Sequence, residues 1–199
     1  MRSEYDFSQG KRGAVISSSA LNEVSVVVAA AAFAAEKHRN QRRKDADASP
    51  YINHPVAVAN VLACEVGITD VRTIAAALLH DTVEDTDATA EELSTLFGDD
   101  ITAIVLEVTD DKSLPKADRK RLQIDRARHL SWRAKLVKLS DKICNVRDID
   151  GSPPVDWSLE RRRDYLHWAY RVVDGLRGVH GGLEALFDGA VSSSRQGLK

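Results

Sequence analysis

The sequence predicts an all-α protein, and two observations carry this prediction. From residue 21 onward, apolar residues recur three and four positions apart, which is the spacing that places them on one face of a helix. The β-branched residues lie among alanines, leucines and charged residues instead of alternating with polar ones, so no segment favours a strand. The chain has 199 residues, 43% of them hydrophobic and 29% charged, which suits one domain with a well-formed core. We therefore expect a single bundle of helices.

Capping residues and glycines mark where the helices should begin and end. Asp70 is placed to accept a hydrogen bond from a free backbone N–H of the helix that follows it. Thr89, with Glu92 three residues later, matches a capping box, and Gly98 is placed where a helix should stop. We predict eight helices, over residues 21–37, 55–65, 71–80, 90–97, 101–109, 116–127, 133–149 and 156–177.

The two ends of the chain differ in composition from the rest. Residues 1–20 and 188–199 are rich in serine, glycine and charged residues, which is typical of short polar tails. The sequence contains no internal repeat. We therefore expect one domain over residues 21–187, with a polar tail on each side.

Charge and composition argue against several classes of protein. A net charge of −2 gives no general attraction to nucleic acid or to an anionic membrane. Residues 112–128 are rich in lysine and arginine, but aspartates interleave with them and no aromatic residue is present to stack on bases. No run approaches the roughly 20 apolar residues of a membrane span, and Cys64 and Cys144 are too few for a disulfide framework. We expect a cytoplasmic protein that binds neither nucleic acid nor membranes.

One segment changes abruptly from apolar to charged. In AAALLHDTVEDTD, residues 75–87, an apolar helix runs into His80, Asp81, Glu84 and Asp85. If helical geometry continues for one more turn, His80 and Glu84 share one face, as do Asp81 and Asp85. Imidazole and carboxylate groups together suit divalent ions such as manganese, iron, zinc or cobalt. The alternative is a helix that ends in a solvated acidic loop, so further ligands must decide between the two.

Two other segments offer such ligands. Asp141 lies in LVKLSDKICNVRDI, beside the apolar stripe of a predicted helix, and His54 lies in YINHP. Each has a simpler interpretation, because Asp141 can form a surface ion pair with a neighbouring lysine and His54 can be a core or capping residue. Together with His80 and Asp81, they would supply two nitrogen and two oxygen ligands and leave coordination positions open for water and substrate.

These motifs resemble the HD-domain phosphohydrolases, and within them the hydrolase part of the RelA/SpoT alarmone enzymes. The most similar group is the small stand-alone alarmone hydrolase of the metazoan SpoT-homologue type. The resemblance extends over about residues 29–168, and its order is specific, because HDTVEDT follows an apolar helix, with YINHP before it and KLSDK after it. The matching stretches are AAFAAEKHRNQRRKD, PYINHPVAVANVL, AALLHDTVEDT, EVTDDKSLPKADRKRLQ, AKLVKLSDKICNVRD and residues 157–165.

The resemblance implies an activity and a role for individual residues. It implies an HD-type helical domain that binds one divalent ion, usually manganese, and removes the 3′-pyrophosphate of ppGpp or pppGpp without synthesising these nucleotides. By the same resemblance the metal ligands are His54, His80, Asp81 and Asp141, and the catalytic acidic pair is Glu84 and Asp85. The implied substrate-binding residues are Arg43, Lys44, Lys116, Asn145, Arg161 and Tyr165.

Two alternatives stay open at this point. The same fold and metal can act on another phosphorylated nucleotide, such as NADPH losing its 2′-phosphate, because the shared residues do not separate the two substrates. A nucleotide sensor without chemistry is the second alternative, and it is less favoured because the chain keeps every matched ligand and both acidic residues. The sequence makes no prediction about the oligomeric state, and it leaves open which carboxylate of the pair is acid and which is base.

Overall fold

The computed structural model describes residues 22–197; residues 1–21 and 198–199 lie outside that range, and with them the predicted N-terminal tail. Within residues 22–197 the chain forms helices and one isolated bridge between Arg42 and Pro50, with no strand, which confirms the all-α prediction. None of these helices is both long and apolar enough to cross a membrane. The elements are α1 (Glu23–Lys37), α2 (Asn53–Asn60), the π-helical segment η2 (Val61–Glu65), α3 (Val71–Leu79), α4 (Thr82–Asp85), α5 (Ala90–Phe97), α6 (Asp99–Val108), α7 (Lys116–Ala127), α8 (Trp132–Gly151), α9 (Leu159–Asp174) and α10 (Gly181–Gly197).

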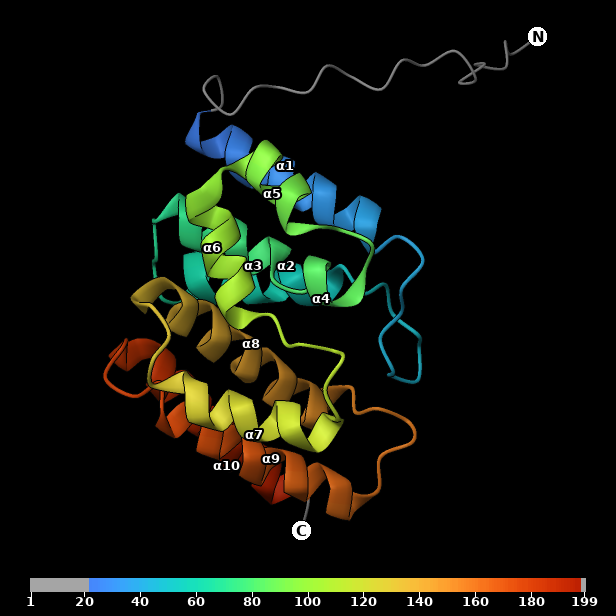
Figure 1. Cartoon of the computed structure of the whole chain (residues 1–199). Coiled ribbons are helices and arrows are strands. Elements are labelled where there is room, and N and C mark those ends of the chain that lie inside the picture. The colour runs from blue at the N-terminus through green and yellow to red at the C-terminus, as the bar shows by residue number, and fades with distance from the viewer. Residues whose placement is uncertain (1–21, 198–199) are drawn as a thin grey trace, which may run out of the picture.

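Helix α8 crosses the middle of the molecule. Figure 1 shows α1 to α6 on one side of it and α7, α9 and α10 on the other. It packs against α2, α3 and α6 on the first side and against α9 and α10 on the second. Helix α3 is the other central element, since it contacts α1, α2, α6 and α8. The predicted site residues His80, Asp81 and Asp141 therefore lie in or directly after α3 and α8, the two central helices of the fold.

The sequence of α8 explains its central position. Its apolar residues Leu136, Leu139, Ile143 and Val146 are fully buried, and they form the stripe expected from their spacing. The polar residues between them are buried as well, so the helix is enclosed on all sides over residues 136–144. Charged groups in such a position need partners, because a desolvated ion without one is strongly destabilising. The fold has to supply those partners from the neighbouring helices.

Most of the predicted helices agree with the structure to within two residues, and the differences have local causes. The helix expected at residues 55–65 begins at Asn53 and turns π-helical at Val61, where Val66 N donates to Val61 O at 3.2 Å. The helix expected at residues 156–177 begins at Leu159, because Ser158 caps it by accepting a hydrogen bond from Arg161 N. Short helix α4 follows α3 directly and was not predicted as a separate element.

The predicted polar tail at residues 188–199 is wrong for the part that the structure describes. Residues 188–197 continue α10, which packs along α8. Leu183, Phe187, Val191 and Ser194 are buried at helical spacing, and Ser194 Oγ donates to Val146 O at 3.1 Å. The polar composition was misleading because serines and glycines occupy the exposed face, while one residue per turn reaches the core.

Replacement of Phe187 tests whether α10 belongs to the folded core. Phe187→Ala removes a fully buried ring, and we expect a loss of roughly 3–5 kcal/mol in the free energy of unfolding, measured by urea denaturation. Ser192→Ala, at an exposed position of the same helix, should change stability by less than about 0.5 kcal/mol. Equal effects of the two substitutions would mean that α10 is not docked on α8.

Candidate functional site

Three segments that lie far apart in the sequence bring four of the predicted site residues together. His54 lies in the first turn of α2, His80 and Asp81 lie at the junction of α3 and α4, and Asp141 lies in the middle of α8. All four line one cavity of about 160 Å³. Both histidines and Asp141 are buried, whereas the Asp81 side chain keeps 18% of its surface exposed. The cluster is thus enclosed but reachable from outside.

An interruption of the helix places His80 and Asp81 on the same side. Helix α3 ends at Leu79, whose carbonyl accepts a hydrogen bond from Thr82 Oγ1 at 2.7 Å. Asp81 precedes the first residue of α4, and its own carbonyl accepts from Asp85 N at 2.8 Å. His80 Nε2 consequently lies 3.2 Å from Asp81 Oδ2. The sequence suggested that the helix could continue for one more turn; instead the helix breaks at His80 and Asp81, and the next turn is the separate helix α4, which carries Glu84 and Asp85 to the same cavity.

The cluster brings lone pairs into close contact. His80 Nδ1 lies 2.8 Å from the carbonyl of Ala77, which places a proton on Nδ1, so Nε2 carries the lone pair when the ring is neutral. That buried Nε2 has no hydrogen-bond partner among residues 22–197, and it faces the Asp81 carboxylate. His54 Nε2 lies 3.1 Å from Asp141 Oδ1 and 3.9 Å from Asp81 Oδ2. Such lone pairs repel one another unless a proton or a metal ion lies between them.

The ligand atoms are spaced as a single ion requires. One nitrogen or oxygen atom from each of His54, His80 and Asp81 lies within 4.8 Å of the other two. Asp141 Oδ1 joins them, at 3.1 Å from His54 Nε2 and 3.9 Å from His80 Nε2. Mixed imidazole and carboxylate donors suit a divalent transition metal. The donor set, the burial and the unpartnered nitrogen are therefore compatible with a divalent metal site.

The electrostatics of the cluster favour a positive charge at its centre. Burial opposes a charged imidazolium, but the Asp81 and Asp141 carboxylates outweigh it and raise the pKa of His80 to about 9. Burial also opposes charge on Asp81, yet His80 and His54 hold the pKa of this carboxyl well below its ordinary value. The pKa of Asp141 is lowered in the same way, first by Lys142 and then by His54.

Asp141 makes both of the contacts that its position in the sequence suggested, an ion pair with a neighbouring lysine and a contact with the histidine cluster. Its Oδ2 pairs with Lys142 Nζ at 2.9 Å, so an ion pair with a neighbouring lysine is present, although it is buried and not at the surface. Its Oδ1 faces the histidines and also accepts a hydrogen bond from Asn145 Nδ2, one turn further along α8. One oxygen is thus fixed by the helix itself, while the other points into the cluster.

The acidic pair is held by residues from two loops and from helix α7. Glu84 Oε2 accepts a hydrogen bond from Asp110 N at 2.9 Å, and Arg119 Nη1 lies 3.8 Å from Oε1. Burial raises the pKa of Glu84, which suits a carboxyl that takes up and releases a proton. Asp85 Oδ2 accepts from Gln41 Nε2 at 3.3 Å, and Asp85 Oδ1 pairs with Lys112.

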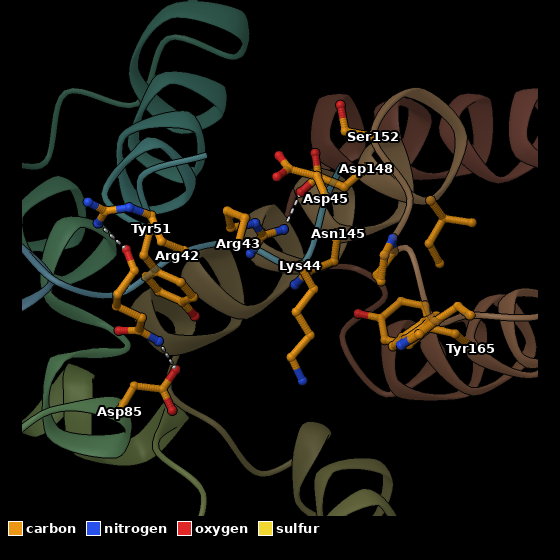
Figure 2. A pocket seen from close by; sticks show the side chains of 14 residues that line it. Arg42, Arg43, Lys44, Asp45, Tyr51, Asp85, Asn145, Asp148, Ser152 and Tyr165 are labelled. Carbon is orange, nitrogen blue, oxygen red and sulfur yellow. Dashed lines mark hydrogen bonds and ion pairs between the residues drawn. The ribbon is translucent and has the colours of Figure 1, made fainter. Parts of the chain in front are cut away.

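A larger cavity of about 440 Å³ adjoins the cluster. It shares Tyr51, Asp85 and Asn145 with the smaller cavity, so the two are joined along these side chains. In the view of Figure 2, Lys44 lies between Asp85 on the left and Tyr165 on the right. The Arg43 guanidinium pairs with Asp148 and lies 5.7 Å from the ring centre of Tyr51. Four predicted substrate-binding residues line this cavity: Arg43, Lys44, Asn145 and Tyr165.

The other two predicted substrate-binding residues lie elsewhere. Lys116, the first residue of α7, and Arg161, in α9, line a separate recess of about 300 Å³. This recess shares Trp157 and Tyr165 with the larger cavity, so the two hollows are separated by aromatic side chains. The structure therefore divides the predicted binding residues between two neighbouring spaces.

Several residues at the site were missed from the sequence. Tyr51 donates its hydroxyl proton to Asp81 Oδ2 at 2.6 Å, and Gln41 and Lys112 hold Asp85. Lys138 is buried in the cavity wall, where its Nζ donates to the carbonyl of Val108 at 3.0 Å. A single tyrosine, glutamine or lysine in a loop or in the middle of a helix forms no recognisable sequence motif. The contacts of these residues become visible only when the folded chain brings their hydrogen-bond and ion-pair partners next to them.

Comparison with known proteins agrees with this geometry. The HD domain family matches residues 30–166. A relative from Xenopus tropicalis, "Guanosine-3′,5′-bis(diphosphate) 3′-pyrophosphohydrolase MESH1", is 54% identical over 84% of this chain and 93% of its own, and the Homo sapiens protein of that name is 53% identical over 82% and 91%. A solved structure described as "A metazoan ortholog of SpoT hydrolyzes ppGpp and plays a role in starvation responses" superimposes with a TM-score of 0.83 at 48% identity, covering 88% of this chain and 97% of that one. This chain belongs to the HD-domain family and, within it, to the family of the MESH1 proteins.

Proposed function

We propose that this protein hydrolyses the 3′-pyrophosphate bond of ppGpp and pppGpp, releasing pyrophosphate and GDP or GTP, with one manganese ion. The observation that carries the proposal is the buried cluster of two histidines and two aspartates beside a cavity of about 440 Å³. Relatives that are 53–54% identical over more than nine-tenths of their own length bear the name of this activity. Because the substrate is a dissolved nucleotide, we assign the activity to the cytoplasm.

In this proposal His54, His80, Asp81 and Asp141 hold the metal. A divalent ion bound there withdraws charge from a phosphate oxygen and lowers the pKa of water. The neighbouring residues keep the ligands in place, since Lys142 fixes one oxygen of Asp141 and Tyr51 donates to Asp81. Such outer partners orient the ligands and tune their affinity for the metal.

The acidic pair handles protons in the proposed reaction. Glu84, whose pKa is raised by burial, accepts a proton from the attacking water or passes one to the leaving oxygen. Asp85 is held between Gln41 and Lys112, so its carboxylate is fixed in direction and suits the orientation of water. The two carboxylates therefore have different environments, which is the condition for different roles.

The larger cavity receives the nucleoside in this proposal. Arg43 and Lys44 approach it from the loop between α1 and α2, and Asn145 lies at the passage to the metal cluster. Arginine can stack on a base or hold a phosphate, and Asn145 is placed to meet the ribose next to the reacting phosphate. Tyr165 forms part of the opposite wall, where the recess that contains Lys116 and Arg161 begins.

Hydrolysis of ppGpp tests the proposal directly. The purified protein with manganese should release pyrophosphate and GDP, and a chelator should abolish the reaction. Asp81→Ala should lower the rate to the level of the chelator control, because it removes a proposed ligand. Asp87→Ala removes a carboxylate of the same segment whose side chain is 89% exposed, and it should leave the rate unchanged. A metal-loaded protein that turns over NADPH but not ppGpp would contradict the assignment.

Proton release should accompany metal binding. Because His80 retains its proton up to about pH 9 in the metal-free protein, an incoming ion has to displace that proton at pH 7. We therefore expect the apparent manganese affinity to strengthen between pH 7 and pH 8, by up to about tenfold for one displaced proton. Calorimetric titration at several pH values measures this affinity, and an affinity independent of pH would mean that metal binding does not displace a proton from His80.

Replacement of Glu84 should separate chemistry from metal binding. Glu84→Gln keeps the size of the side chain but removes its capacity for proton transfer, and we expect kcat to fall by about 10²- to 10⁴-fold. The manganese affinity should stay within about threefold of the wild type, because Glu84 is not among the proposed ligands. Glu91→Gln, an exposed glutamate of α5, serves as the control. A parallel loss of metal affinity in Glu84→Gln would assign this residue to the metal instead.

A further inference from the structure

His38 is a buried polar residue to which the proposed function assigns no role. It caps the C-terminal end of α1 and is only 1% exposed. Its ring nitrogen Nδ1 lies 2.6 Å from Gln41 Oε1. Gln41 in turn donates from Nε2 to Asp85 Oδ2 at 3.3 Å, which is the dashed line that reaches Asp85 in Figure 2. A chain of hydrogen bonds thus runs from the core of the protein to one carboxylate of the acidic pair.

The direction of this chain is fixed at its Asp85 end. The Asp85 carboxylate pairs with Lys112, and an ionised carboxylate can only accept hydrogen bonds. The amide of Gln41 must therefore turn its NH₂ group to Asp85, which leaves its oxygen facing His38. Two lone pairs at 2.6 Å would repel each other, so this contact requires a proton on Nδ1 of His38. His38 consequently donates to Gln41, and Gln41 donates to Asp85.

The second ring nitrogen of His38 agrees with this assignment. Nε2 is buried and has no hydrogen-bond partner among residues 22–197. A proton on Nε2 in place of Nδ1 would leave a buried N–H without an acceptor and would also break the bond to Gln41. The surroundings of the ring therefore select one tautomer, the one that can orient the Gln41 amide.

The backbone around Gln41 is held independently of its side chain. Gln41 N donates to the carbonyl of His38 at 2.9 Å, and the carbonyl of Gln41 accepts from Tyr51 N at 3.1 Å. These two bonds fix where the side chain begins, but they do not decide which end of its amide meets Asp85. That choice depends on the donor at Nδ1 of His38.

The ring of His38 has a second contact, which a test must separate from the first. It packs on the ring of Tyr51, with ring centres 4.8 Å apart and an angle of 31° between the planes. Tyr51 donates to Asp81, so the packing also supports the site. Loss of the ring and loss of the hydrogen-bond donor are different changes, and each can be made alone.

We propose that His38 is a positioning residue for hydrolysis, which orients the Gln41 amide so that Gln41 holds the Asp85 carboxylate in one direction. The inference rests on the proposed function, in which Asp85 is one of the two catalytic carboxylates. His38 lines neither the metal cavity nor the larger cavity, so it acts through Gln41 and not on the substrate. Without its donor, the amide can turn its oxygen to Asp85, and an attraction becomes a repulsion.

Two substitutions of His38 separate the hydrogen bond from the ring contact. His38→Asn places an amide N–H near the position of Nδ1 but lacks the ring, whereas His38→Phe keeps a ring beside Tyr51 but has no donor. We expect kcat for ppGpp to fall about ten- to a hundredfold in His38→Phe, with KM within about threefold of the wild type, because a misdirected carboxylate slows the chemistry more than binding. In His38→Asn kcat should stay within about threefold of the wild type.

The control for a mere loss of stability is Thr73→Val. It removes a fully buried hydroxyl in the first turn of α3, at the end of that helix away from His80, and should leave kcat unchanged. Equal losses of kcat in His38→Asn and His38→Phe, or a larger loss in His38→Asn, would overturn the proposal.

A double variant tests whether His38 and Gln41 act in series. Gln41→Met keeps the length of the side chain but lacks the amide, so it should lower kcat about as much as His38→Phe. The combination of both should be slower than either single variant by less than about threefold, because the chain of bonds is already broken. Losses that multiply would mean independent roles and would contradict the proposal.

The tautomer of His38 separates this inference from the proposed function. In the full chain loaded with zinc, which is diamagnetic, nitrogen–proton NMR correlation of the imidazole rings should place the proton of His38 on Nδ1. The signal is assigned by its disappearance in His38→Asn. If the protein does not hydrolyse ppGpp, the proposed function fails, while the tautomer still decides whether His38 can donate to Gln41. A proton on Nε2 and none on Nδ1 would refute the inference, whatever the activity.

Discussion

The carboxylate of Asp141, buried in the middle of α8, requires compensating charge on each of its oxygens, and much of the structure follows from this requirement. Removing a carboxylate from water costs several kcal/mol unless partners surround it. Lys142 satisfies one oxygen from the same helix, while His54 of α2 and Asn145 meet the other. The contact between Asp141 and His54 thus links α8 to α2, and together with the packing of α3 against both it brings histidines and carboxylates within reach of a common ion.

The break between α3 and α4 places neighbouring residues both in the histidine–aspartate cluster and in the wall of the adjoining cavity. Because α3 ends at Leu79, His80 and Asp81 turn toward the cluster while Glu84 and Asp85 continue on the next helical turn. The loop before α2 then reaches Asp85 through Gln41, and the loop before α7 reaches the pair through Asp110 and Lys112. Both loops therefore help to fix the positions of the two carboxylates.

Three neighbouring hollows meet at Tyr51, Asn145 and Tyr165. The smallest one holds the histidines and carboxylates, the largest one lies beside it, and the wall of the recess between α7 and α9 carries lysines and arginines. Acidic side chains therefore predominate on one side of the larger cavity, and basic side chains predominate on the other.

The helical class and most helix positions follow from the sequence alone, and the sequence also singled out the four residues that the structure brings together in one buried cluster. Only the tertiary structure shows how the environments of these four residues differ. Helical spacing and the motifs around His80 and Asp141 are local patterns, so they are readable from the chain alone. The dual role of the two Asp141 oxygens, the hydrogen bond from Tyr51 and the grouping of Lys120 with Arg161 depend on contacts between segments that are distant in sequence. The polar composition of residues 188–197 predicted a tail, but these residues belong to helix α10, and contact with α8 buries one side of that helix. Local periodicity fixes which residues share a face, but only packing decides what that face meets.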